Sequence, residues 1–251
     1  MDPGYRSPLV DFFRRGEVAE DVRLLAAQGV LAPRAHEQLA LLILLSDDAN
    51  TNVSGSACAT LDRLPASSVQ AFLARSDVPE EMRAFFAARG IEAAPVPGAA
   101  DAPLVEAEGE PDPAEAAADP AILSSLPIMK RMKIAMKGTR EQRAQLIRDS
   151  NKLVAAAVLS SPKLTEAEVE SFARMANVTE DVLRVIATNR NWTKNYGVVA
   201  GLTKNPKTPP AISMQLLPRL NDRDMKKLAI DRNIPEAVRI SARKYLVKGK
   251  D

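Results

Sequence analysis

Cysteine is nearly absent from this sequence, which contains only one, Cys58, among 251 residues. A single cysteine excludes an internal disulfide framework and any metal or iron–sulfur site that needs several cysteine ligands. Long apolar runs are also missing: the most apolar stretch, LALLILL at 39–45, is far shorter than the ~20 residues that span a bilayer. No basic stretch followed by an apolar run opens the sequence, so no signal peptide is expected. We therefore expect a cytoplasmic protein without a membrane span.

Aromatic residues are scarce at 4%, and the first 120 residues contain no lysine. Because Ala and Leu supply most of the apolar side chains, close-packed helices are favoured over sheets. Residues 1–120 hold 9 Arg against 20 Asp and Glu, whereas residues 121–251 hold 25 Lys and Arg against 12 Asp and Glu. The small net charge of +2 therefore conceals an acidic first half and a basic second half.

The segment 91–120 contains eight acidic residues and no basic one, with Pro and Ala throughout. Such a composition buries too little apolar surface to offset the entropy lost on ordering, so a disordered linker is predicted. The predicted organisation is an N-terminal HEAT-like helical domain at 1–90, the acidic linker at 91–120 and a basic helical-repeat domain at 121–251.

An eleven-residue pattern recurs along the chain. Residues 172–182 read FARMANVTEDV, residues 72–82 read FLARSDVPEEM, and residues 12–22 and 228–238 follow the same pattern. Asn or Asp at its sixth place is expected to cap a helix, and the later Glu would face the positive end of the helix dipole. Units in this frame recur about every 14 residues in the second half, and helices this short must stack on neighbours to bury an apolar face. The pattern therefore predicts an all-α fold of short stacked helices.

Two pairs of stretches carry a resemblance to known repeat families. NPKTPPAISMQLL (205–217) and LAIDRNIPEAVRISA (228–242) resemble the bacterial leucine-rich repeat variant family, while SDDANTNVSGSACATL (46–61) and SDVPEEMRAFFAARG (76–90) resemble degenerate HEAT repeats. The resemblance implies an α-solenoid with a curved binding surface, in two helical domains joined by the linker. It implies no activity. The founding leucine-rich repeat variant protein has a cysteine-ligated iron–sulfur region, and this chain lacks those cysteines, so no cofactor is expected.

Few residues could carry catalysis. The only histidine, His36, has no nucleophile motif nearby, and we interpret it with Glu37 and Gln38 as the polar shoulder of a helix. Cys58 lies in an Ala-rich helical stretch, where a small buried thiol is expected. The sequence therefore predicts no catalytic residue, no metal site and no enzymatic activity.

Trp192 and Tyr196, in NRNWTKNYG, could stack on a ligand. Alignment with the neighbouring units instead favours packing roles, with Tyr196 in the core and Trp192 keeping one edge exposed. The asparagines around them are interpreted as turn and cap residues.

The basic segment 127–148, PIMKRMKIAMKGTREQRAQLIR, is the best functional candidate. Methionines recur on one face at helical spacing, and lysines occupy another. Three interpretations stay open: a solvated face over a methionine core, a surface for an anionic partner, and an amphipathic helix on a membrane. The predicted partner-binding residues, which include lysines from later turns, are Lys130, Arg131, Lys133, Lys137, Arg140, Arg143, Lys194, Lys204 and Lys207.

Two functional hypotheses follow from the repeats and the charge. In the first, the chain is a non-enzymatic adaptor or scaffold that binds a protein partner with an acidic surface through its basic C-terminal solenoid. In the alternative, the same surface binds nucleic acid, because an excess of Lys and Arg suits the phosphate backbone. The oligomeric state stays open.

Overall fold

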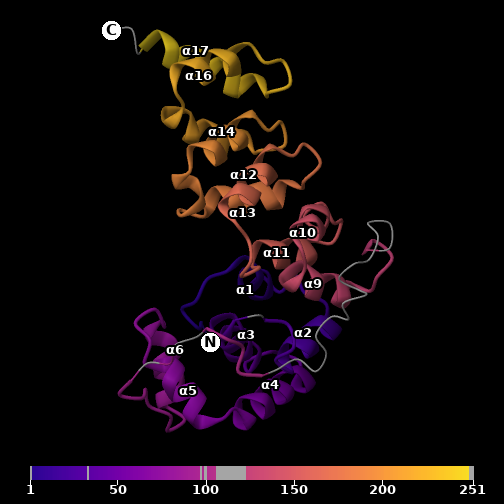
Figure 1. The fold of residues 1–251 in the computed structure, drawn as a ribbon, viewed down its shortest axis with the longest axis vertical. Helices are drawn as coiled ribbons and strands as arrows, with labels where there is room; N and C mark the ends of the chain where they lie inside the picture. The colour runs from indigo at the N-terminus through magenta and orange to yellow at the C-terminus, as the bar shows by residue number, and fades with distance from the viewer. Residues whose placement is uncertain (1, 33, 97, 99–100, 106–122, 249–251) are drawn as a thin grey trace. The chain divides into compact units, whose positions relative to one another are not determined.

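A computed structural model of the protein describes residues 2–32, 34–96, 98, 101–105 and 123–248. In this part of the chain the regular structure comprises 15 α-helices, two short 3-10 helices and no strand (Figure 1). The predicted all-α class is confirmed.

The chain divides into two compact units, 1–139 with 156–163, and 140–155 with 164–251. The helices before residue 139 are α1 (Pro8–Arg14), α2 (Glu20–Ala27), α3 (Ala35–Leu45), α4 (Thr51–Arg63), α5 (Ala66–Leu73), α6 (Glu80–Ala87) and α9 (Ile128–Lys137). Those that follow are α10 (Arg140–Leu146), α11 (Lys152–Leu159), α12 (Glu166–Arg174), α13 (Glu180–Thr188), η1 (Trp192–Lys194), α14 (Tyr196–Lys204), α15 (Pro210–Leu216), η2 (Leu217–Arg219), α16 (Asp222–Ile230) and α17 (Glu236–Lys248).

The expected disordered linker, residues 91–120, is described only in part. Residues 106–120 of that segment lie outside the described residues, so the linker and its boundaries at 90 and 120 stay predictions. The earlier part of the segment is hydrogen-bonded within the N-terminal unit: the Ala94 amide donates to the Gln70 carbonyl and the Gly98 amide to the Ala71 carbonyl. Helix α9, expected in the C-terminal domain, belongs to the first compact unit.

The recurring pattern marks helix starts. In its four copies the Glu is the first residue of a helix, at Glu20, Glu80, Glu180 and Glu236. The apolar residues two before and two after each Glu are at most 5% exposed, as in Val78, Met82, Val178 and Val182. A carboxylate at this position lies beside the positive end of the helix dipole. The pattern is therefore a turn that enters a packed helix.

The expected capping role of the sixth residue is wrong. The residue before the helix, Ala19, Pro79 or Thr179, is the N-cap of α2, α6 and α13, and none of the three makes a side-chain capping bond. Asp77 and Asn177 lie three residues before the helix, too early to reach its free amides. In α12 the spacing of Thr165 and Glu168 in LTEAEV predicts a capping box, and the structure confirms it, since the two residues exchange both hydrogen bonds.

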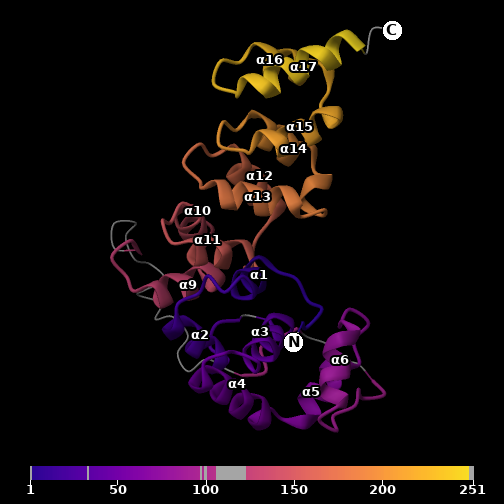
Figure 2. The same cartoon turned by 180° about the vertical axis from the view of Figure 1, so that it is seen from behind.

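In the C-terminal unit the helices contact each other in sequential order. Helix α12 packs on α10 and α14, α14 on α16, and α15 on α17. The layers α12–α13, α14–α15 and α16–α17 follow one another in both views (Figures 1 and 2). From α11 to α17 successive helices start 14, 14, 16, 14, 12 and 14 residues apart. The near-constant spacing reflects short helices joined by short turns.

The turns between these helices are built by polar side chains that accept from the amide two residues ahead. The acceptors are Asp149, Asn189, Asn205 and Asp231. Asn205 also links layers: its amide nitrogen donates to the Ala173 carbonyl at 3.0 Å and to the Met175 carbonyl at 2.9 Å. Asn189 is thus a turn residue and Asn195 caps α14, as predicted for the asparagines around Trp192.

Helices α12 and α14 approach closely because α14 carries two glycines, Gly197 and Gly201. A Cβ atom on Gly201 would lie 3.1 Å from the Cβ of Ala173 and from the Cγ of Arg174, and one on Gly197 would overlap the Glu170 carboxylate. The contact between the two helices therefore depends on small residues at this spacing.

Tyr196 was predicted in the core, and this prediction is wrong. Its side chain is 40% exposed, and its hydroxyl donates to Asp224 Oδ2 at 2.5 Å. The insertion of η1 lengthens this unit, so Tyr196 becomes the first residue of α14. Val198, the third residue of the helix and fully buried, takes the position that Val182 has in α13.

Within the described residues, every helix is too short or too polar to cross a bilayer.

Candidate partner-binding surface

The predicted binding residues are divided between the two compact units. Four of them, Lys130, Arg131, Lys133 and Lys137, lie on α9 in the first unit. Lys130 and Lys137 are exposed, whereas Arg131 and Lys133 are half-buried. Since the remaining five belong to the second unit, the nine residues are not one surface of a single unit.

Arg143 does not lie on a solvent-facing surface. It is 4% exposed, and its guanidinium makes paired hydrogen bonds to Glu168, with Nε donating to Oε1 at 2.9 Å. The same carboxylate accepts from the Thr165 amide at 3.0 Å and from the Thr165 hydroxyl at 2.9 Å. A buried guanidinium requires such a partner, so Arg143 holds α10 to the start of α12 and is unavailable to a ligand.

The other four predicted residues of the second unit differ in what they contact. Arg140 is exposed at the start of α10, and the exposed Lys194 donates to Asn191 Oδ1 at 3.3 Å. Lys204 is half-buried and lies 2.5 Å from Asp224 Oδ1, where its ammonium and the Tyr196 hydroxyl lower the pKa of that carboxyl. Lys207 is exposed, but its ammonium donates to the Val178 carbonyl at 3.2 Å. Lys204 and Lys207 thus connect neighbouring layers.

A group of cations that the sequence reasoning missed lies on the last two helices. Residues 222–248 contain eight Lys and Arg against four Asp and Glu. Six of these cations are exposed and, within the described residues, none of the six forms an ion pair. They define the α16–α17 basic surface: Arg223, Lys226, Lys227, Arg232, Arg243 and Lys244. Counting charge helix by helix would have found this surface in the sequence.

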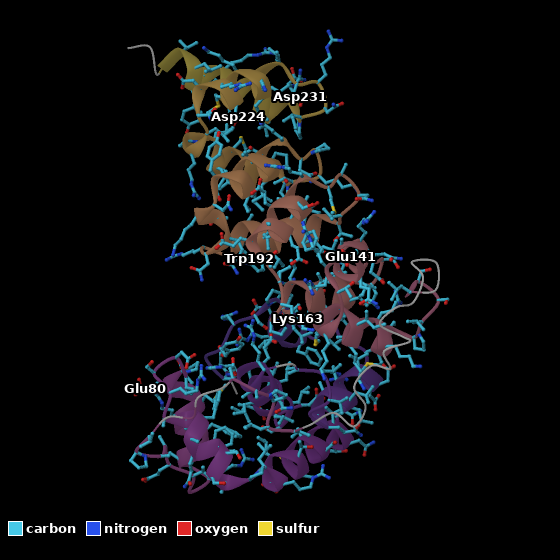
Figure 3. All side chains as sticks on the ribbon, viewed as in Figure 1. Glu80, Glu141, Lys163, Trp192, Asp224 and Asp231 are labelled. Carbon is cyan, nitrogen blue, oxygen red and sulfur yellow. The ribbon has the colours of Figure 1, made fainter. Side chains whose placement is uncertain are left out.

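Acidic residues of the same helices neutralise this surface only in part, since Asp222 and Glu236 are exposed at the starts of α16 and α17. Asp224 is engaged by Lys204 and Tyr196 of α14, and Asp231 accepts the Asn233 amide at 3.0 Å in the turn between the helices. Figure 3 labels both carboxylates on the α16–α17 layer. Since Lys and Arg outnumber Asp and Glu by eight to four in residues 222–248, the surface keeps a net positive charge.

Three aliphatic side chains are exposed among these cations. Ile230 is 74% exposed, Ile240 42% and Val247 70%. Ile230 lies one helical turn after Lys226, while Ile240 and Val247 lie on either side of Arg243 and Lys244 at helical spacing. The α16–α17 basic surface therefore combines positive charge with apolar area.

The other residues singled out in the sequence take structural positions. Trp192, labelled in Figure 3, is half-buried between α13 and α14, and its backbone amide donates to the Asn189 side chain. Cys58 is partly exposed on α4 and not a fully buried thiol.

The predicted polar shoulder on α3 is wrong, because His36, Glu37 and Gln38 are all buried, at 3%, 1% and 1% exposed. The His36 ring is stacked on Tyr5, with ring centroids 5.3 Å apart, and meets the edge of Phe72 at 4.6 Å. Its Nδ1 lies 3.0 Å from Asp101 Oδ1. Within the described residues, no group of three or more His, Cys, Asp and Glu side chains is arranged to hold a metal ion.

Comparison with known proteins returned no matching family model, no matching curated protein and no matching solved structure.

Proposed function

We propose that this chain is a non-enzymatic helical-repeat scaffold that binds a protein partner with an acidic surface through the α16–α17 basic surface. The observation that carries the proposal is the group of six exposed cations without ion pairs in the described part of the chain. Positive charge that is not neutralised within the protein attracts an oppositely charged partner and speeds its association.

The exposed aliphatic residues favour a protein partner over nucleic acid. Ile230, Ile240 and Val247 can bury apolar area against another protein, and burial of this kind forms the centre of protein interfaces. A phosphate backbone offers charge but no such apolar contact. In this proposal the stacked layers of the C-terminal unit act as a solenoid that presents the surface.

Fluorescence anisotropy with two probes tests the proposal on the full chain. One probe is a labelled peptide designed as an amphipathic helix, with a leucine stripe flanked by glutamates, and the other is a short DNA duplex. The variant Lys226→Glu with Lys244→Glu should bind the peptide about tenfold more weakly than the wild type, because each reversal replaces attraction by repulsion.

A matched control separates the surface from net charge. Arg140→Glu with Arg190→Glu changes the charge by the same amount elsewhere in the same unit and should alter peptide binding less than about twofold. Equal losses in the two variants would contradict a specific surface. Binding of DNA that falls steeply with salt, without binding of the peptide, would favour the nucleic-acid alternative.

A further inference from the structure

The N-terminal unit holds a short segment of its own chain, irregular and bent at Leu104 and Val105, against α3. Residues 101–105, DAPLV, lie beside the first turn of this helix, more than sixty residues away along the sequence. Asp101 Oδ1 accepts the backbone amide of His36 at 3.1 Å and lies 3.0 Å from His36 Nδ1. One carboxylate oxygen thus contacts both the helix start and the imidazole.

Gln38 binds the other end of the segment through its side-chain amide. Its Oε1 accepts the Leu104 amide at 2.7 Å and the Val105 amide at 3.0 Å, and its Nε2 donates to the Val105 carbonyl at 3.0 Å. The remaining Nε2 hydrogen is directed to the Gly29 carbonyl at 2.8 Å. The Gln38 side chain therefore offers the segment the donor and acceptor that a neighbouring peptide group would offer.

The shape of this site depends on Gly29. Its φ of +79° lies in the left-handed region, where a side chain is strained. A Cβ atom there would lie 3.1 Å from the Val105 side chain. Glycine thus gives Val105 room to lie against the backbone. The rings of Tyr5 and Phe72 fix the orientation of His36 from the side.

The contacts involve groups that a peptide of the same sequence could supply if its backbone bends at the Leu–Val pair. They involve one carboxylate, two consecutive backbone amides with a carbonyl, and one aliphatic side chain. Ala102, between the contacts, is exposed, and Pro103, which has no amide hydrogen to satisfy, favours the extended conformation. Leu104 and Val105 are only half-buried, so the segment lies on the surface of the unit.

We propose that Gly29, His36 and Gln38 form a peptide-recognition site, which binds a peptide with an acidic residue three positions before a Leu–Val pair at which the backbone bends. Residues 101–105 occupy this site in cis. Binding of a short segment through its backbone groups, with selected side chains giving specificity, is a general mode of peptide recognition. Because the cis segment is tethered, it competes with any partner peptide at high effective concentration. The site lies in the first compact unit and does not depend on the function proposed for the α16–α17 basic surface.

The first experiment opens the site in the full chain. In the opened variant, Asp101→Gly removes the carboxylate that contacts His36, and Leu104→Pro and Val105→Pro remove the two backbone amides that donate to Gln38. The probe is the fluorescein-labelled, end-capped peptide ADAPLVE, which copies residues 100–106. We expect the peptide to bind the opened variant at least about tenfold more tightly than the wild type. Equal binding to both proteins, or no binding to an opened variant whose circular dichroism matches the wild type, would overturn the proposal.

The second experiment leaves the protein untouched and changes the peptide. N-methylation of the amide that corresponds to Val105 removes a donor to Gln38, and an Asn in place of the Asp removes the charge beside His36. Each change should weaken binding to the opened variant about tenfold, the effect expected for losing a hydrogen bond to a buried or charged group. A scrambled peptide of the same composition that binds as well as ADAPLVE would contradict sequence recognition.

Discussion

Arg143 and Glu168 form a paired, buried ion contact inside the C-terminal unit, with Nη2 donating to Oε2 at 3.0 Å and both side chains at most 5% exposed. Removal of one partner leaves an unpaired charge in a low-dielectric interior. We expect Arg143→Met to lower the free energy of unfolding by about 3–5 kcal/mol, measured by urea denaturation. Arg148→Met removes an exposed guanidinium of the following turn and should cost less than about 0.5 kcal/mol. An equally small loss of unfolding free energy in both variants would contradict a stabilising role for the Arg143–Glu168 pair.

Glu37 should make stability depend on pH. Burial raises the pKa of its carboxyl above the ordinary value of 4.5, although the hydroxyls of Ser7 and Ser160 oppose the rise. The folded protein therefore holds the proton more tightly than the unfolded chain, and the contribution of Glu37 is fully favourable below pH 4.5. That contribution is lost as the pH rises through the raised pKa.

The variant Glu37→Gln keeps the shape of the neutral acid and removes its titration. We expect it to be more stable than the wild type at pH 8 and nearly equal to it near pH 4, by urea denaturation at both values. Glu20→Gln, at an exposed residue of α2, is the control and should not change with pH in this way. A constant difference between wild type and Glu37→Gln across this range would refute the prediction.

The glycines of α14 and α4 should respond in opposite directions to alanine. Gly201→Ala introduces a methyl group that is crowded by Ala173 and Arg174, and we expect a loss of about 1–3 kcal/mol. Gly55, in the middle of α4, has nothing within 4 Å of the added Cβ, so Gly55→Ala should stabilise by about 0.5–1 kcal/mol through helix propensity. Thermal unfolding followed by circular dichroism measures both. A gain at both positions would show that α12 and α14 can separate at little cost.

Asn205 should contribute more to stability than Asn191, an exposed asparagine before the preceding helix, α14. Asn205→Ala leaves the carbonyls of Ala173 and Met175 without their donor in a buried place, at a cost of about 1–3 kcal/mol. Asn191→Ala removes an exposed side chain whose partner is Lys194 and should be nearly neutral. Urea denaturation of the two variants distinguishes a link between layers from a simple turn residue.

The helix starts could be predicted from the sequence because their signals are local. Glu at the first helical position and apolar residues two places on either side recur at Glu80, Glu180 and Glu236, and the structure starts helices there. The capping box joins Thr165 to Glu168, three positions later, and was equally predictable from the sequence. Tyr196 was misplaced because a 3-10 turn, η1, inserts two residues that the alignment of units did not include.

The candidate sites were less predictable because their geometry depends on distant partners. Arg143 is hydrogen-bonded to a carboxylate 25 residues later in the sequence, and His36 to one 65 residues later. The polar residues next to each of them in the sequence predicted an exposed helix surface instead. The α16–α17 basic surface was not predicted for another reason: its cations, such as Lys226 and Lys244, are spread over two helices, whereas those of 127–148 are closely spaced in the sequence. The choice between a protein partner and nucleic acid stays a prediction.

Helix α11 contributes its first half, residues 152–155, to one compact unit and its second half, 156–159, to the other. Neither unit is therefore a continuous stretch of chain, and a cut at 120 or 139 would separate 156–163 from the helices it packs with. Serine hydroxyls on this stretch reach back across the sequence: Ser160 accepts the Leu9 amide at 3.3 Å, and Ser161 donates to the Met136 carbonyl at 2.7 Å. Autonomous folding should accordingly be sought in the whole chain, since a cut at 120 separates Leu9 from Ser160 and a cut at 139 also separates Met136 from Ser161.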